Sequence, residues 1–140
     1  MHTNHKLPVD AFGTEADNAF AEVIQPGLTV VMNAFVTIIS GGTPVFCDID
    51  RDTWNITADN IRPLITSKTK AIMPVHYASS SKGMDEVYVL AKEYGLRVVE
   101  DAAPAFGCER SEKTIGSNGD IVCFSFYSKS GLAEQFQLFL

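Results

Sequence analysis

The sequence lacks the features that mark disulfide-rich, metal-binding or nucleic-acid-binding proteins. Its three cysteines, Cys47, Cys108 and Cys123, are odd in number and widely spaced, with no CxxC pair or Cys/His cluster. This pattern favours buried free thiols over a disulfide framework or a zinc site, and we expect no bound metal. Acidic residues outnumber basic ones, giving a formal net charge of -6, so a nucleic-acid surface is not expected.

The sequence also has no long hydrophobic run. The most apolar stretch, residues 28–39, is too short to cross a bilayer and contains Asn33. The first residues, MHTNHKLPVDAFG, show no basic region followed by an apolar one, as a signal peptide would. Hydrophobic residues make up 46% of the chain and charged residues 20%, which is typical of globular domains. We therefore expect a cytoplasmic protein without membrane contact.

Short apolar strands alternate with helical segments along most of the chain. The pattern predicts strands at residues 23–24, 44–49, 69–76, 96–101 and 120–126, and helices at residues 29–40, 57–65 and 84–94. Thr57 is a suitable N-cap, and Gly95 is a suitable C-terminal stop. This alternation predicts an α/β fold whose mostly parallel sheet is covered by helices on both faces.

Polar side chains follow three of the predicted strands, at the edge where parallel sheets bind ligands. They are His76, Asp101 and several of residues 125–129. A carboxylate there can hold a protonated pyridine nitrogen, a lysine can form a Schiff base with an aldehyde, and a hydroxyl can bind a phosphate. These are the parts of a pyridoxal phosphate (PLP) site. Surface Asp–Lys pairs and hydrogen-bonded serines explain the same residues without a ligand, and spacing leaves both interpretations open.

Four segments, in this order, carry a resemblance to a known family: PVFCDIDRDTWNI, TKAIMPVHY, MDEVYVLAKEYGLRVVEDAA and GDIVCFSFY. Over residues 22–129 the chain resembles the DegT/DnrJ/EryC1/StrS sugar aminotransferases. The resemblance implies part of the large domain of a fold type I PLP-dependent transferase, with pyridoxal 5'-phosphate as cofactor. It also implies amino-sugar and polysaccharide biosynthesis, a nucleotide-linked keto-sugar substrate, an amino donor that is usually glutamate, and a homodimer.

The resemblance assigns a role to individual residues. Asp101, in EDAA, matches the aspartate that pairs with the pyridine nitrogen, and Ser125, in FSF, matches the serine that binds the cofactor phosphate. Lys129 is the candidate Schiff-base lysine and general acid/base, although it follows Ser125 by four residues where the family has five. Val30 stands where the family commonly has an aromatic residue that stacks on the ring. His76 lies in a loop near the site in the family, as a site residue or as a structural one.

The resemblance is weaker at three other places. Pro104 stands where the family has Gln or His near the cofactor's phenolic oxygen, and it has neither a side-chain donor nor a backbone N–H. Residues 1–21 are poorly matched, with FGTEADNAF as a faint likeness of the phosphate-binding turn. Residues 130–140 resemble nothing in the family, and we expect its C-terminal small domain to be absent.

The sequence therefore predicts a truncated PLP-dependent sugar aminotransferase. The alternative is a non-catalytic remnant, or a fragment that binds PLP or a nucleotide-sugar without transaminase activity. A third interpretation is a nucleotide-binding α/β domain that works without PLP. Neither a GxGxxG nor a GxxxxGK[ST] motif supports that third interpretation.

Overall fold

Five short parallel strands form the centre of the fold in the computed structural model, which describes residues 20–117 and 119–125. The strands are β1 (Glu22–Pro26), β2 (Thr43–Cys47), β3 (Thr69–Ile72), β4 (Arg97–Asp101) and β7 (Ile121–Cys123). Their order in the sheet is β2-β1-β3-β4-β7, and every pairing is parallel. The predicted α/β fold with a mostly parallel sheet is confirmed.

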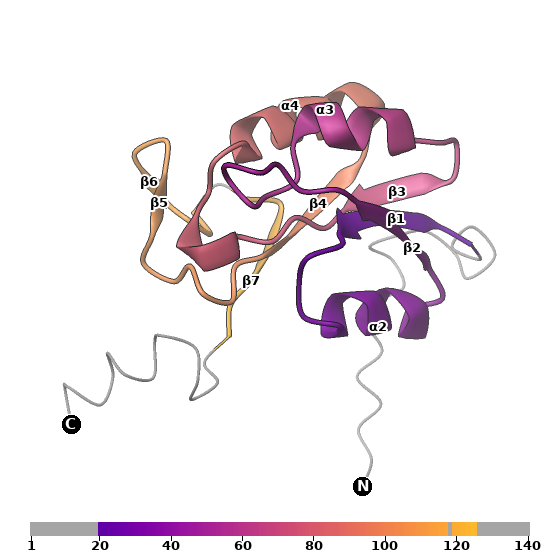
Figure 1. The fold of residues 1–140 in the computed structure, drawn as a ribbon, viewed down its shortest axis with the longest axis horizontal. Coiled ribbons are helices and arrows are strands. Elements are labelled where there is room, and N and C mark those ends of the chain that lie inside the picture. Colours follow the sequence, from indigo (N-terminus) through magenta and orange to yellow (C-terminus); the bar gives the residue numbers. More distant parts are fainter. Residues whose placement is uncertain (1–19, 118, 126–140) are drawn as a thin grey trace, which may run out of the picture.

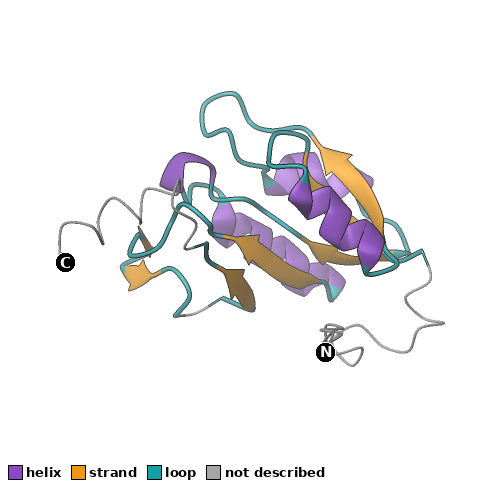
Figure 2. Cartoon of the chain, turned by 90° about the horizontal axis from the view of Figure 1, so that it is seen from below, coloured by secondary structure: helices purple, strands orange, loops and turns teal. Residues whose placement is uncertain are grey.

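Helices cover the sheet on both faces (Figures 1 and 2). Helix α3 (Ala58–Ile61), the 3-10 turn Arg62–Leu64 and helix α4 (Met84–Tyr94) lie on one face, and helix α2 (Met32–Ile39) lies on the other. The core lies mainly beneath α4, whose apolar face packs on side chains that alternate along the strands. Its fully or almost fully buried members include Ile24, Ile72, Val87, Leu90 and Val98. Full burial of such a side chain contributes about 1.5–3 kcal/mol.

Two helix boundaries follow the predicted signals, and a third does not. Thr57 caps α3, since its side chain accepts a hydrogen bond from the Asn60 N–H, and Gly95 ends α4 with a φ of 66°. Helix α2 begins at Met32, so the prediction of a helix from residue 29 was wrong at its start. The N-cap position is Val31, which makes no side-chain capping hydrogen bond, and the Thr29 hydroxyl accepts a hydrogen bond from the Asn33 side chain. Residues 28–31 consequently form a loop over the carboxyl ends of the strands.

A small hairpin of β5 (Glu109–Arg110) and β6 (Lys113–Thr114) was not predicted from the sequence. The two residues of its turn, Ser111 and Glu112, have φ values of 50° and 63°. Hairpin turns of this kind normally contain Gly, Asn or Asp, because other residues rarely adopt a positive φ. The predicted strand 69–76 is also shorter than expected: β3 ends at Ile72, followed by a hydrogen bond from the Met73 N–H to the Ile24 carbonyl and a bridge from Val75 to Asp101.

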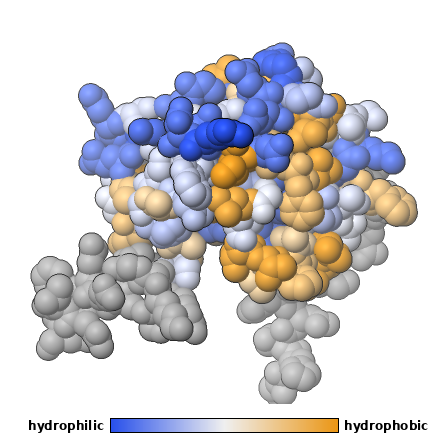
Figure 3. Space-filling model, viewed as in Figure 1, coloured by the Kyte–Doolittle hydropathy of each residue, from blue (hydrophilic) through white to orange (hydrophobic). Residues whose placement is uncertain are grey.

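The outer face of α2 is apolar and exposed (Figure 3). Its exposed large side chains are Met32, Phe35, Val36, Ile38 and Ile39, and Val31 at its N-cap is exposed as well. Within residues 20–117 and 119–125, no helix has the length and apolar character needed to span a membrane.

The three cysteines are free thiols, but they differ in burial. Cys47 is buried as expected, whereas Cys108 is half-buried and Cys123 is exposed. The prediction of buried thiols was therefore wrong for Cys123. Cys123 lies in the edge strand β7, whereas Cys47, in the other edge strand β2, packs into the core.

Candidate functional site

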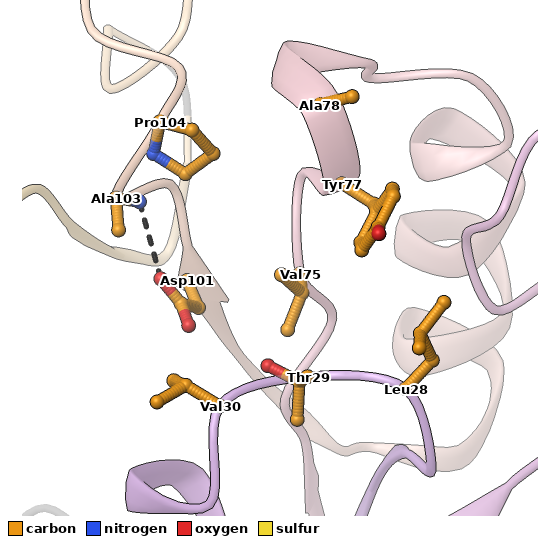
Figure 4. Close-up of a pocket in the computed structure, with 9 residues that line it drawn as sticks. All are labelled: Leu28, Thr29, Val30, Val75, Tyr77, Ala78, Asp101, Ala103 and Pro104. Carbon is orange, nitrogen blue, oxygen red and sulfur yellow. Dashed lines mark hydrogen bonds between the residues drawn. The ribbon is translucent and has the colours of Figure 1, made fainter. Parts of the chain in front are cut away.

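A pocket of about 390 Å³ opens where β1, β3 and β4 end (Figure 4). This volume lies within the range of small-molecule sites, roughly 300–1,000 Å³. Three segments supply its walls: the loop after β1, the chain after β3 and the turn after β4. The lining residues are Leu28, Thr29, Val30, Val75, Tyr77, Ala78, Asp101, Ala103 and Pro104. Of these nine described residues, Asp101 alone carries a charge, so the pocket favours a ligand with a positively charged group against an apolar body.

The backbone and the side chain of Asp101 are both held by hydrogen bonds. Its N–H donates to the Pro74 carbonyl and its own carbonyl accepts from the His76 N–H, each at 2.9 Å. Its Oδ1 accepts from the Ala103 N–H at 3.1 Å, and its Oδ2 accepts from Asn33 Nδ2 at 3.0 Å. Each carboxylate oxygen has two lone pairs, so both keep the capacity to accept a hydrogen bond from a ligand. Asp101 is thus a fixed, half-buried acceptor in the pocket.

Residues 28–30 form the wall opposite Asp101, and Figure 4 shows the Asp101 carboxylate directed towards Thr29 and Val30. Val30 is 57% exposed and presents an aliphatic side chain to the opening. An aliphatic side chain can cover one face of an aromatic ring, but without the stacking geometry of an aromatic residue. The wall and the carboxylate together suit a flat ring whose edge carries a proton.

His76 does not line the pocket but is buried in a charged network on the other side of β4. Its Nε2 lies 2.5 Å from Oε2 of Glu100, and both side chains are fully buried. Because an ionised carboxylate only accepts hydrogen bonds, Nε2 is the protonated ring nitrogen. Oε1 of Glu100 accepts from the Tyr88 hydroxyl, and both oxygens accept from Arg110 at 3.2 Å. His76 is therefore a structural residue that ties the pocket segment after β3 to β4.

Adjacent residues of a strand point to opposite faces, which explains why Glu100 faces α4 while Asp101 faces α2. Burial alone raises the pKa of Glu100, but the hydrogen bonds from His76 and Tyr88 and the charge of Arg110 outweigh it, so the pKa is lowered. Burial, followed by the hydrogen bond to Glu100, raises the pKa of Tyr88 to about 12. The network is therefore built around an ionised Glu100 and a neutral Tyr88 hydroxyl.

The structure brings some of the predicted site residues together and leaves others apart. Asp101 and Val30 face the same pocket, and Pro104 lies at its rim. Ser125 is half-buried two residues beyond the end of β7 and is not among the lining residues. Lys129 lies outside the described residues. The register of β7 against β4, which pairs Cys123 with Asp101, directs the chain that leads to Ser125 towards this edge of the sheet.

Sequence reasoning missed Asn33 and Tyr77. Asn33 donates to Asp101, and Tyr77 lines the pocket and stacks on Trp54 with ring centroids 5.5 Å apart. The one available signal for Asn33 is that it interrupts the apolar stretch 28–39. A polar residue at that point in a helix needs a partner, but the sequence does not say which one.

A parallel sheet with a carboxylate in a pocket at its carboxyl edge is the architecture of the fold type I PLP-dependent aminotransferases, and comparison with known structures supports this class. The sequence model of the DegT/DnrJ/EryC1/StrS aminotransferase family matches residues 7–134. The chain belongs to this family. Aminotransferases of the family use PLP.

Three similar proteins illustrate the relationship. An uncharacterised protein of Methanocaldococcus jannaschii is 44% identical over 111 residues, which are 79% of this chain and 29% of that protein. The structure of DesI in the presence of its TDP-sugar product has a TM-score of 0.74 at 37% identity, covering 81% of this chain and 29% of DesI. The structure of NtdA from Bacillus subtilis, with the cofactor PMP bound, has a TM-score of 0.74 at 33% identity, covering 85% of this chain and 26% of NtdA. This chain thus spans less than a third of the length of these relatives.

The pocket fits the pyridine part of the family's cofactor. The Asp101 carboxylate keeps acceptor capacity towards a protonated ring nitrogen, and the aliphatic wall at Val30 can cover a ring face. The ring nitrogen would be held by Asp101, and its face by residues 28–30.

Proposed function

We propose that this chain binds PLP in the pocket at Asp101 and supplies the cofactor-binding part of a sugar aminotransferase. The observation that carries the proposal is the single carboxylate in an otherwise uncharged pocket, held by Asn33 and the Ala103 N–H at the carboxyl edge of a parallel sheet. When bound, the cofactor supplies the electron sink that allows an amino group to move between carbon atoms.

Each proposed site residue has a separate task. Asp101 keeps a proton on the ring nitrogen, because an opposite charge within hydrogen-bond distance favours the charged form of the ring. Val30 covers one face of the ring and excludes water from it. Ser125 donates its hydroxyl to the cofactor phosphate, and Lys129 provides the amine that anchors the cofactor and moves a proton as general acid/base.

The substrate we propose is a nucleotide-linked keto-sugar, with glutamate as amino donor, in amino-sugar and polysaccharide biosynthesis. The likeness to DesI, whose structure was determined with its TDP-sugar product, supports the nucleotide-sugar class. The exposed apolar face of α2 supports a homodimer, because apolar patches of this kind mark protein interfaces. The three free thiols suit a reducing compartment, and we place the protein in the cytoplasm.

A second function, binding of PLP or a nucleotide-sugar without transamination, is favoured by one observation. Pro104 stands at the rim of the pocket with neither a side-chain donor nor a backbone N–H to offer a ligand. A cofactor held there would lack a hydrogen bond on that side. Binding requires Asp101 and the phosphate site, whereas turnover also requires the general acid/base that moves the proton.

The test is a titration of the full chain with PLP, followed by borohydride reduction and peptide mass spectrometry. We expect a visible absorption band in the wild-type protein and a reduced adduct on Lys129. Lys129→Ala should remove both, and Asp101→Asn should weaken binding at least tenfold. Asp48→Asn, at an exposed position after β2, is the matched control and should change neither.

Adducts spread equally over several lysines, or a band that survives Lys129→Ala, would contradict the assignment of the amine. If the band and adduct form as expected, an assay for the amination of nucleotide-linked keto-sugars by glutamate then distinguishes the aminotransferase from the binding protein. Turnover identifies the aminotransferase, and cofactor binding without turnover identifies the binding protein.

A further inference from the structure

Asn33 links the two sides of the pocket through one side-chain amide. It lies in the first turn of α2 and is half-buried. Its Nδ2 lies 3.0 Å from Oδ2 of Asp101 and 3.2 Å from Oγ1 of Thr29. An ionised carboxylate accepts hydrogen bonds and cannot donate them, so the amide must present its NH2 group to Asp101. The orientation of the Asn33 side chain is thus set by the charge of its partner.

The backbone around Asn33 holds this amide in place. Its N–H donates to the Val30 carbonyl at 3.3 Å, and its own carbonyl accepts from the Thr37 hydroxyl at 3.1 Å. Thr37 is buried against the sheet side of α2. Asn33 therefore sits on a fixed point of the helix and connects the loop at residues 29–30 with the carboxylate of β4.

We propose that Asn33 is a positioning residue for Asp101. Its amide donates one hydrogen bond to Asp101, which holds the carboxylate in one rotamer, and another to Thr29, which fixes the spacing between the carboxylate and the wall at Thr29 and Val30. This leaves the remaining acceptor capacity of the carboxylate directed into the pocket. The part of the inference that concerns a bound ring rests on the proposed function, whereas the part that concerns the Asp101 rotamer does not.

The first measurement uses the full chain without any ligand. Three-bond NMR couplings across χ1 of Asp101 report whether the side chain occupies one rotamer or several. We expect one rotamer in the wild-type protein and averaged couplings in Asn33→Ala, a change that favours the helix through its propensity. The control is Asn60→Ala, which removes an amide hydrogen bond of 3.0 Å to the Asp48 carbonyl outside the pocket. It should leave the Asp101 couplings unchanged.

The second measurement is the affinity for 4'-deoxypyridoxine 5'-phosphate, a ring phosphate without an aldehyde, so that Lys129 is not needed. We expect Asn33→Ala to weaken binding about tenfold and Asn60→Ala to leave it unchanged. Asn33→Asp should weaken binding more than Asn33→Ala at neutral pH, because a second carboxylate beside Asp101 repels it and offers no donor. A space-filling role predicts the opposite order, since Asp keeps the volume of Asn.

Averaged couplings in Asn33→Ala, with Asn33→Asp as the weaker binder, support the positioning role. Unchanged Asp101 couplings in Asn33→Ala overturn it, as does an affinity for Asn33→Asp that exceeds that of Asn33→Ala. If the wild-type chain does not bind the probe but Asp101 loses its rotamer in Asn33→Ala, the positioning role is supported and the proposed function fails.

Discussion

The buried carboxylate of Glu100 offers a sharp test of how this fold is held together. Glu100 is fully buried and interacts with His76, Tyr88 and Arg110, which come from the segment after β3, from α4 and from β5. The substitution Glu100→Gln removes the charge and keeps the volume of the side chain. Its effect therefore reports on the charged network without the contribution of a cavity.

The magnitude follows from what the substitution leaves behind. Breaking a buried ion pair by removing one partner costs about 3–5 kcal/mol, because the other charge stays buried. Arg110 is 5% exposed, but its Nε also lies 3.4 Å from the carboxylate of Asp85, which keeps part of the compensation. Gln also retains one acceptor oxygen. We therefore expect the lower end of the range, a loss of about 3 kcal/mol in the free energy of unfolding, a large fraction of the stability of a small domain.

The assay is urea unfolding at pH 7, followed by the fluorescence of Trp54, the single tryptophan of the chain. The control is Glu93→Gln, which breaks the exposed pair of Glu93 with Arg62 and should have a far smaller effect. A loss below about 1 kcal/mol for Glu100→Gln would refute the reasoning, since the buried charge would then contribute no more than a surface pair.

The wild-type protein and Glu100→Gln also allow a test of pH dependence. The pKa of Glu100 is lower in the folded chain than in the unfolded one, where it is about 4.3. Its contribution to stability is therefore complete above that value and is lost as the pH falls through the folded-state pKa. The difference in unfolding free energy between the wild-type protein and Glu100→Gln should shrink below about pH 4. A difference that stays constant from neutral to acidic pH would contradict the assignment of an ionised Glu100.

Two further predictions concern glycine and cysteine positions. Gly119→Ala places a Cβ 2.3 Å from Cγ2 of Val122 and should lower the free energy of unfolding by about 1–3 kcal/mol. The control is Gly27→Ala, where the nearest atom to the new Cβ lies at 3.9 Å. Thermal unfolding should therefore give Gly119→Ala the lower melting temperature of the two. Similar melting temperatures would show that the β4–β7 region adapts freely. A thiol reagent at pH 8 should modify the exposed Cys123 before the buried Cys47, whose pKa is raised to about 11 by burial and a neighbouring carboxylate. Peptide mapping that finds both thiols modified at equal rates would contradict this burial.

The sequence was sufficient to predict those features of the structure that depend on a local pattern of residues. The apolar face of α4 and the Gly95 stop were readable because helix periodicity and a left-handed C-terminal residue are local signals. Asp101 was readable as a strand-end carboxylate for the same reason, and its position in the pocket agrees with that expectation. Local order and composition thus sufficed for the fold class, whereas the role expected for Asp101 came from the family resemblance.

Features that depend on distant partners were not readable. The turn at Ser111 and Glu112 lacks the usual turn residues, and Arg110 beside it is held by Glu100 and Asp85, which no local pattern indicates. The contact between Asn33 and Asp101 joins two elements that are far apart in the sequence. Such contacts depend on where the whole fold places α2 relative to the carboxyl ends of the strands.

The most direct test of cofactor binding is chemical-shift mapping of the full ¹⁵N-labelled chain with pyridoxamine 5'-phosphate. If the pocket at Asp101 is the cofactor site, saturable shifts should occur at the backbone amides of Thr29, Val30, Tyr77 and Ala103. The amides on the outer face of α4 should stay unchanged. Shifts centred on α4, or no saturable shifts at millimolar ligand, would contradict the site.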